Sequence, residues 1–137
     1  VTHNGERVPA INIKTNAPIQ ITSREYFDND VFLIDEIQFF HSQILTALEV
    51  LLKNGKTVIV AGLDLDFAGK PFFLTASLMA VAEDVLKLKA VCVSCGSDSW
   101  VSYKVPNGQR IQLGTDEYKP MCRKCFNNKK SGSGELK

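Results

Sequence analysis

The sequence lacks a long apolar run, and it lacks an excess of charge of one sign. No stretch approaches the roughly 20 apolar residues that a membrane-spanning helix requires, and no basic-then-apolar signal pattern opens the chain. We therefore expect a cytoplasmic protein with no membrane partner. Its 16 basic and 15 acidic side chains give a formal net charge of +1. This balance argues against a nucleic-acid partner and favours a small neutral-to-anionic ligand.

Cysteine is scarce, and its placement is informative. The four cysteines form two C-x2-C pairs with 26 residues between them: Cys92, Cys95, Cys122 and Cys125. Two such pairs in a short cytosolic chain fit a tetrahedral zinc site better than they fit disulfides, because thiols are kept reduced in that compartment. Four protein ligands leave no coordination position for a substrate, so the predicted zinc is structural. The alternative is four unrelated structural cysteines.

A glycine-rich phosphate-binding loop is also missing from these 137 residues. Gly55-Lys56-Thr57 resembles the end of a G-x-x-x-x-G-K-[ST] motif, but the first glycine of that motif would fall at Val50. In addition, this GKT closes a predicted helix and enters a strand, whereas a phosphate-binding loop follows a strand and opens a helix. The loop that cradles a triphosphate is therefore absent from these residues.

The feature around which the rest is organised is the run 31–40, VFLIDEIQFF. Val31–Ile34 predicts a strand buried on both faces, and Asp35 and Glu36 follow at its carboxyl end, where α/β sheets bind ligands. Side-chain alternation predicts that the two acids point in different directions, so that one faces a metal and the other a proton. This is the Walker-B pattern of phosphoryl-transfer enzymes. On pattern alone, a strand that merely meets solvent is an equal alternative.

The residues after the acids predict a βαβ unit. Ser42 is the predicted cap of a helix, and Gly55 is its predicted left-handed terminus. Between them, apolar residues recur at helical spacing, at Ile44, Leu45, Leu48, Leu51 and Leu52. The segment 57–63, TVIVAGL, predicts a second buried parallel strand, so the fold class is α/β with a parallel sheet and flanking helices.

Weaker patterns predict the remaining elements. We expect strands at 8–13 and 85–91, a short helix within 19–30, a helix at 74–82, a hairpin of 100–105 and 110–113 around Pro106-Asn107-Gly108, and a flexible tail at 127–137. The segment 64–73, DLDFAGKPFF, predicts a loop. Its Phe67, Phe72 and Phe73, with Phe39 and Phe40, either belong to the core or form an aromatic slot for a flat ring beside the acids.

The chain closely resembles the cytosolic zinc-containing (type II) thymidine kinases through four motifs that occur in the same order. They are VFLIDEIQFF, TVIVAGLDLDFAGKPF, LKAVC and the two C-x2-C pairs with a tyrosine before the second. The resemblance runs over about 2–126. It implies a P-loop-kinase-like α/β core and a small zinc-ribbon domain whose lasso loop covers the nucleoside. It makes Glu36 the general base on the sugar 5′-hydroxyl and Asp35 the acid near Mg²⁺. The base pocket would be lined by Phe39, Leu63, Phe67 and Phe72, and the lasso would contact the nucleoside through Ser102, Ile111 and Tyr118.

The resemblance implies that ATP and thymidine are the substrates and that dTMP is the product. It also implies a structural Zn²⁺ and a Mg²⁺ bound to ATP. By the same resemblance, dTTP would be a feedback inhibitor and the assembly would be a homotetramer. It divides the chain into an α/β core at 1–88, a zinc-binding lasso domain at 89–126 and the tail. The core would be incomplete without its phosphate-binding segment, so we expect the chain to be a carboxyl-terminal part that is inactive alone.

Two other readings of the residues remain open. One is a zinc-ribbon binding module, for instance for nucleic acid, with a degenerate α/β partner. The balanced charge and the lack of a basic stripe argue against it. The other is a P-loop ATPase whose paired acids position water. The phenylalanines and the lasso favour an organic acceptor instead.

Overall fold

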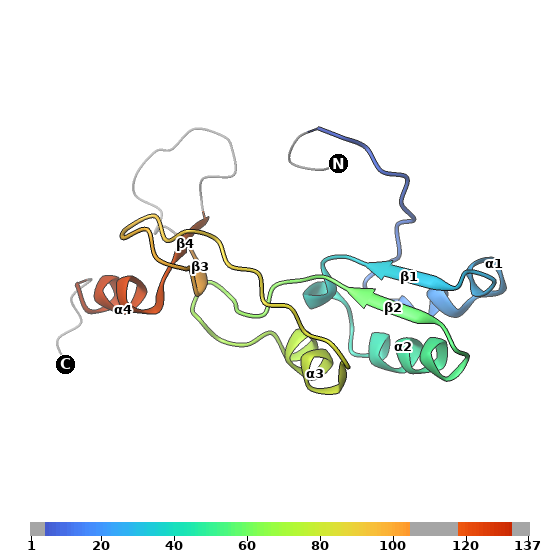
Figure 1. The fold of residues 1–137 in the computed structure, drawn as a ribbon. Helices are drawn as coiled ribbons and strands as arrows, with labels where there is room; N and C mark the ends of the chain where they lie inside the picture. Colours follow the sequence, from blue (N-terminus) through green and yellow to red (C-terminus); the bar gives the residue numbers. More distant parts are fainter. Residues whose placement is uncertain (1–4, 105–117, 133–137) are drawn as a thin grey trace. The chain divides into compact units, whose positions relative to one another are not determined.

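The computed structural model describes residues 5–104 and 118–132 (Figure 1). Contacts between residues divide the chain into two compact units, Val1–Gly62 and Leu63–Lys137, and each is described by itself. By these contacts the segment 63–88 belongs to the unit that contains the four cysteines. The functional division into a kinase core and a lasso domain stays a prediction.

The first unit is built on a βαβ arrangement, as the sequence predicts. Strand β1 (Val31–Ile34) pairs in parallel with β2 (Thr57–Val60), in a register that sets Val31 opposite Thr57 and Ile34 opposite Val60. Helix α2 (Gln43–Lys53) connects the two strands and packs beside the sheet (Figure 1). The carboxyl ends of both strands therefore lie at the same edge.

Burial of the two strands is one-sided, which corrects the prediction that both faces are buried. Phe32 and Ile34 are half-buried, whereas Leu33 is 75% exposed and its partner Ile59 is 55% exposed. A run of apolar residues indicates that both faces of a strand are suited to burial, but it does not show what packs against the second face. Among the described residues of this unit, only one side of the sheet is packed.

Helix α2 forms the core of the first unit with the segment that precedes β1. That segment contains the 3-10 helix η1 (Pro18–Thr22) and the short helix α1 (Arg24–Phe27), as predicted for 19–30. The buried side chains are aliphatic, namely Ile21, Ile37, Ile44, Ala47, Leu48 and Leu51. Four of them, Ile44, Ala47, Leu48 and Leu51, lie on one face of α2. The helical spacing predicted three of these, but it missed Ala47 and included Leu52, which is 50% exposed.

The two ends of α2 differ in how well the sequence predicts them. Gly55 has φ +74° and the Lys56 amide donates to the Leu51 carbonyl, which is the left-handed terminus expected there. At the amino end, the Ser42 side chain makes no capping hydrogen bond. Instead, the Gln43 amide donates to Nδ1 of His41 at 3.3 Å, so the preceding histidine takes the place of the predicted serine cap.

The second unit contains helix α3 (Phe73–Val81), the antiparallel pair β3 (Val101–Lys104) and β4 (Tyr118–Met121), and helix α4 (Arg123–Gly132). Its buried cluster consists of Cys92, Val101, Met121 and Phe126, with Leu65, Trp100 and Tyr103 packed against it. The helix predicted at 74–82 is thus confirmed within one residue at each end. Among the described residues, no helix is long and apolar enough to cross a membrane.

Two predicted strands are wrong. The segment 8–13 is exposed except at half-buried Ile13, and it forms no strand, since Pro9 lacks an amide donor and no neighbouring strand pairs with it in the described part of the chain. The segment 85–91 also forms no strand. Only Val91 makes a bridge, to Asp98, while Leu86 and Leu88 are 83% and 87% exposed. Alternation indicates which side chains share a face but not whether a partner strand is present.

The predicted hairpin and tail are seen only in part. Strand β3 matches the predicted strand at 100–105, but its described partner is β4, which was not predicted. The turn at 106–108 and the strand at 110–113 lie outside the described residues. The tail expected to be flexible from residue 127 instead begins as helix, because α4 continues to Gly132. Residues 133–137 lie outside the described part.

Candidate functional site

The paired acids follow β1 directly, at the carboxyl edge of the parallel sheet. β1 ends at Ile34, whose carbonyl accepts a 2.8 Å hydrogen bond from the Ala61 amide. The chain then turns, and the Ile37 amide donates to the Ala61 carbonyl at 3.1 Å. Asp35 and Glu36 are therefore held between two main-chain contacts to the end of β2, and both side chains are exposed.

Glu36 has an unusual backbone conformation. Its φ of 54° and ψ of 39° lie in the left-handed region, and it is the one non-glycine residue of positive φ in the described part of the chain. A non-glycine side chain there costs about 1–2 kcal/mol, and such strain gathers at functional sites. β1 ends at Ile34, so strand alternation does not set the directions of the two acids, and their divergence stays a prediction.

Each carboxylate has its own hydrogen-bond partner. Oδ1 of Asp35 accepts a 2.8 Å hydrogen bond from the amide of Glu36, and Oε2 of Glu36 accepts one from the side-chain amide of Gln38. Gln38 belongs to the 3-10 helix η2 (Ile37–Phe39) and is only 8% exposed. A buried amide thus fixes the orientation of an exposed carboxylate.

Gly62 provides the space that Gln38 occupies. A Cβ atom at Gly62 would lie 2.5 Å from Oε1 of Gln38 and 2.7 Å from Cγ2 of Ile37, both far inside van der Waals contact. This glycine, two residues after β2, therefore permits the close approach of η2 to the sheet edge. Gln38 and Gly62 are the residues that our sequence reasoning missed. A polar residue within the apolar run IQFF, two positions after a candidate base, is the signal that would have identified Gln38.

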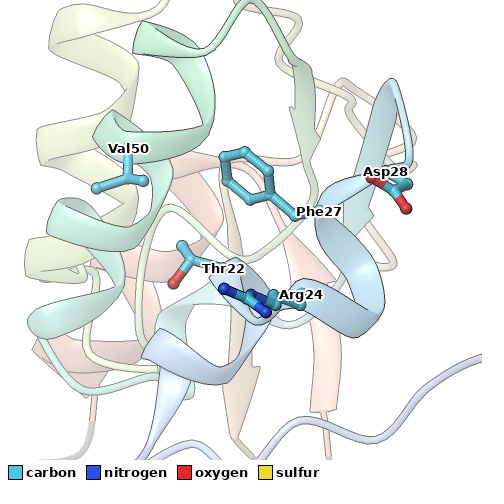
Figure 2. A pocket seen from close by; sticks show the side chains of 5 residues that line it. All are labelled: Thr22, Arg24, Phe27, Asp28 and Val50. Atoms are coloured by element: carbon cyan, nitrogen blue, oxygen red, sulfur yellow. The ribbon is translucent and has the colours of Figure 1, made fainter.

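Hollows in the first unit lie at both ends of the sheet. Figure 2 shows one lined by residues of η1, α1 and α2 and the turn that enters β1, namely Thr22, Arg24, Phe27, Asp28 and Val50. These residues precede β1 or pack beside it, so this hollow is not at the acidic edge. A smaller hollow is lined by Leu33, Ile34, Asp35, Ile59 and Ala61, and it includes one of the acids. Phe39, also at this edge, is 62% exposed.

The second unit carries the other predicted base-pocket residues on the 64–73 loop and next to it. Leu63 is 46% exposed, Phe67 is 53% exposed and Phe72 is half-buried. The loop is closed by its own contacts: the Phe72 amide donates to the Asp64 carbonyl, and Oδ1 of Asp66 accepts from the amides of residues 68 and 70, all at 2.9 Å. Asp66 therefore has a structural role in this loop.

The predicted lasso contacts lie partly within the β3–β4 pair. Ser102 is half-buried in β3 and sits opposite Pro120, and Tyr118 begins β4 opposite Lys104 and is 49% exposed. Ile111 lies outside the described residues. The structure thus brings Ser102 and Tyr118 to neighbouring strands, and it places the acids and Phe39 in the other unit.

The four cysteines converge as the sequence predicts. Their sulfur atoms all lie within 4.8 Å of one another, and those of Cys95 and Cys122 are 3.6 Å apart. Four thiolates around a zinc ion at about 2.3 Å would be separated by about 3.8 Å, so the cluster could hold zinc. No disulfide links them. Cys92 is buried and Cys95 is exposed.

The chemistry of the donor set also fits a cation. Backbone hydrogen bonding, chiefly from Cys122, lowers the pKa of the Cys92 thiol to about 6, and the Ser97 side chain lowers the pKa of Cys95. By contrast, the neighbouring sulfurs, first that of Cys122, raise the pKa of Cys125 to about 12. Four sulfurs this close do not all ionise unless a positive ion is present to balance their charge.

A comparison with protein families supplies the deciding observation. Residues 1–126 match the family model described as thymidine kinase. The chain belongs to the thymidine kinase family. The matched range contains both the acidic edge and the cysteine cluster, so this membership supports a kinase-type function with thymidine and nucleotide substrates. A cysteine cluster that could hold zinc is also consistent with the zinc-binding thymidine kinases.

Proposed function

We propose that this protein is a thymidine kinase that transfers the γ-phosphoryl group of ATP to the 5′-hydroxyl of thymidine and so forms dTMP. One observation carries the proposal beyond family membership: an exposed carboxylate, Glu36, is held in a strained conformation at the carboxyl edge of the sheet and oriented by buried Gln38. The described residues contribute the acceptor side of the reaction, because no phosphate-binding loop motif occurs among the 137 residues.

Glu36 is the proposed general base. The amide of Gln38 donates to Oε2, which leaves Oε1 to accept the proton of the sugar hydroxyl. A base must lie within hydrogen-bond reach of the proton that it removes, and a carboxylate fixed at one oxygen presents the other in a defined direction. The strain at φ 54° is consistent with a functional position.

Asp35 is the proposed partner of magnesium. Its Oδ1 accepts the Glu36 amide, and its exposed carboxylate fits the oxygen ligands that Mg²⁺ prefers. Bound Mg²⁺ would neutralise charge on the transferred phosphoryl group. By analogy with the Walker-B pattern, this role also supports a P-loop-kinase-like fold for the complete enzyme.

The nucleoside site is the proposed role of the exposed aromatic residues. Phe39 and Phe67 keep more than half of their surface exposed, and rings left in this state favour stacking on a flat ligand. Family resemblance adds Leu63, Phe72, Ser102, Ile111 and Tyr118 as contacts to thymidine. The zinc held by the four cysteines would be structural, since no coordination position is left for substrate.

The test is the substitution Glu36→Gln, which preserves shape and removes basicity. General-base catalysis is worth about 10²–10⁴ in rate, so kcat should fall by about that factor while thymidine affinity changes little. Turnover is measured with ATP and Mg²⁺ in a form of the chain joined to a phosphate-binding loop. Thymidine affinity is measured by calorimetry on the 137-residue chain, and Glu83→Gln at an exposed position serves as the matched control. A kcat within about threefold of the parent would overturn the assignment and leave Asp35 as the next candidate.

Three further features follow from family resemblance. We propose feedback inhibition by dTTP, which carries the thymidine moiety together with a triphosphate, and this predicts inhibition that is competitive with thymidine. We also propose a homo-oligomer, specifically a tetramer, which sedimentation tests. The exposed apolar face around Leu33 and Ile59 supports association with another polypeptide. A cytoplasmic location stays a prediction.

A further inference from the structure

The 64–73 loop lies against the only tryptophan of the chain through a glycine. Gly69 has φ +78°, and a Cβ atom there would lie 2.7 Å from Cη2 and 3.2 Å from Cζ3 of the Trp100 ring. It would also lie 3.5 Å from Cε1 of Phe126. Both the backbone conformation and the space therefore require glycine, and the loop backbone touches the ring directly.

Trp100 is itself fixed to the part of the unit that holds the cysteines. Its amide donates to the carbonyl of Met121, next to Cys122, at 2.7 Å. Its ring meets that of Phe126 edge to face, with centroids 5.5 Å apart, and the guanidinium of Arg123 lies 3.8 Å from its centroid. The position of the indole thus depends on β4, which ends just before Cys122, and on α4, which contains Cys125.

The remaining contacts make the loop follow Trp100 as a unit. Nζ of Lys130 donates to the carbonyl of Ala68 at 3.2 Å, and Leu65 packs against the buried cluster that contains Cys92. Within the loop, the Asp66 carboxylate accepts hydrogen bonds from two main-chain amides, and the Asp66 amide donates one to the Lys70 carbonyl. A loop closed by its own hydrogen bonds moves as one piece, so an anchor at Gly69 also sets the positions of the phenylalanines at 67 and 72.

We propose that Trp100 is a positioning residue, whose ring contacts connect the cysteine cluster to the 64–73 loop. Metal binding by the cysteines then fixes the position of Trp100 and, through it, the positions of Phe67 and Phe72. Gly69 is the point of contact. The consequence for nucleoside affinity rests on the proposed function, whereas the coupling between metal and loop does not. Neither residue touches the reacting groups in this scheme.

Hydrogen exchange of the loop amides tests the coupling without any ligand. In the zinc-loaded chain, Gly69→Ala forces the ring and the loop apart, and Trp100→Ala removes the anchor. Each should accelerate exchange of the 64–73 amides by about tenfold or more, as should removal of zinc with a chelator. Gly55→Ala is the matched control, because Gly55 has φ +74° but a Cβ atom added to it would meet no other atom within 4 Å. It should leave loop exchange unchanged.

A second measurement separates coupling from loss of fold. Zinc content is determined for every variant, and Gly69→Ala, which lies outside the metal ligands, should retain one zinc per chain. In the double variant of Gly69→Ala and Trp100→Ala, no ring remains for the added Cβ atom to meet. The changes in loop exchange caused by the two single substitutions should therefore not be additive. Loop exchange that stays at the parent rate in zinc-loaded Gly69→Ala and Trp100→Ala would overturn the proposal.

Thymidine affinity then distinguishes this inference from the proposed function. If the parent binds thymidine, Gly69→Ala should weaken binding by about tenfold with zinc retained, and unchanged affinity would overturn the positioning role. If the parent does not bind thymidine, the nucleoside site fails. Accelerated loop exchange in the zinc-loaded variants would still support the coupling of the metal to the loop.

Discussion

The two units use different means to hold their cores. In Val1–Gly62, six buried aliphatic side chains pack from η1, η2 and α2, and four of them lie on one helix face. In Leu63–Lys137, the buried cluster is small and includes Cys92, with Val101, Met121 and Phe126 around it. The first unit is stabilised by ordinary hydrophobic burial. The second buries few apolar side chains among its described residues, and its cysteines lie where a metal would supply further free energy.

Cations surround the rings of the second unit, but they do not replace a metal. Among its described residues, four ring contacts occur, namely Lys104 with Tyr118, Arg123 with Trp100, Lys129 with Tyr103 and Lys130 with Phe126. Each such contact at an exposed site contributes about 0.5–1 kcal/mol. A structural zinc contributes on the order of 10 kcal/mol. The comparison therefore predicts that metal loss affects one unit and spares the other.

Chelation of zinc is the strongest test of this difference. We expect zinc removal to unfold the region around β3, β4 and α4, because on the order of 10 kcal/mol of binding free energy is lost. Emission of Trp100, the single tryptophan, reports this unit, and exchange protection of the α2 amides reports the other. Cys92→Ser should act in the same way. A metal assay that finds no zinc, or α2 protection lost together with the tryptophan signal, would contradict the division.

Truncation of a buried leucine in α2 should destabilise the first unit alone. Leu51→Ala removes a side chain of zero exposure and should cost about 2–5 kcal/mol of unfolding free energy, by lost burial and by the cavity left behind. Its neighbour Leu52 is 50% exposed, so Leu52→Ala is the matched control with a small effect. Both are measured by denaturant unfolding together with zinc affinity. Equal losses from the two variants would contradict the role given to burial in this core. Weakened zinc binding in Leu51→Ala would show that the two units are not independent.

Periodicity and spacing predicted the parts of this fold that depend on local chemistry. Three of the four buried positions of α2, its Gly55 terminus and the parallel pairing of β1 with β2 follow from apolar spacing and from the βαβ pattern. The convergence of the four cysteines follows in the same way, because C-x2-C spacing suits one metal. Each of these features has a recognisable pattern of residue types in the sequence.

Features that depend on distant partners were not predictable in this way. The left-handed turn at Glu36 is stabilised by contacts to Ala61 and Gln38, and propensity alone disfavours it for a glutamate. β4 was missed because the segment YKPM is short and contains Pro120, so it carries no strand pattern. The exposed segment 85–91 shows the converse, since a strand-like pattern forms no strand without a partner.

A change at the sheet edge tests the first unit at its functional end. Gly62→Ala places a Cβ against Gln38 and Ile37 and should cost about 1–3 kcal/mol by overpacking. It should also displace the side-chain amide of Gln38 that orients Glu36. Turnover, measured in the form joined to a phosphate-binding loop, should therefore fall by more than the lost stability accounts for. Gln38→Ala in the same background removes one of the two clashes and should recover part of the stability but not of the turnover. A Gly62→Ala protein as stable and as active as the parent would contradict the role given to Gly62.

The smallest effect expected is at the cation–ring contact of Trp100. Arg123→Gln removes the guanidinium that lies 3.8 Å from the ring centroid and should lower the unfolding free energy of the second unit by about 0.5–1 kcal/mol. Lys124, the next residue of α4, is also exposed and has no ring contact among the described residues, so Lys124→Gln controls for the loss of one positive charge beside the cysteines. Denaturant unfolding of the zinc-loaded chain, followed by Trp100 emission, measures both. A loss confined to Arg123→Gln shows that the contact itself stabilises the unit. Equal losses would attribute the effect to charge near the thiolates, and the metal would then account for nearly all the stability of this unit.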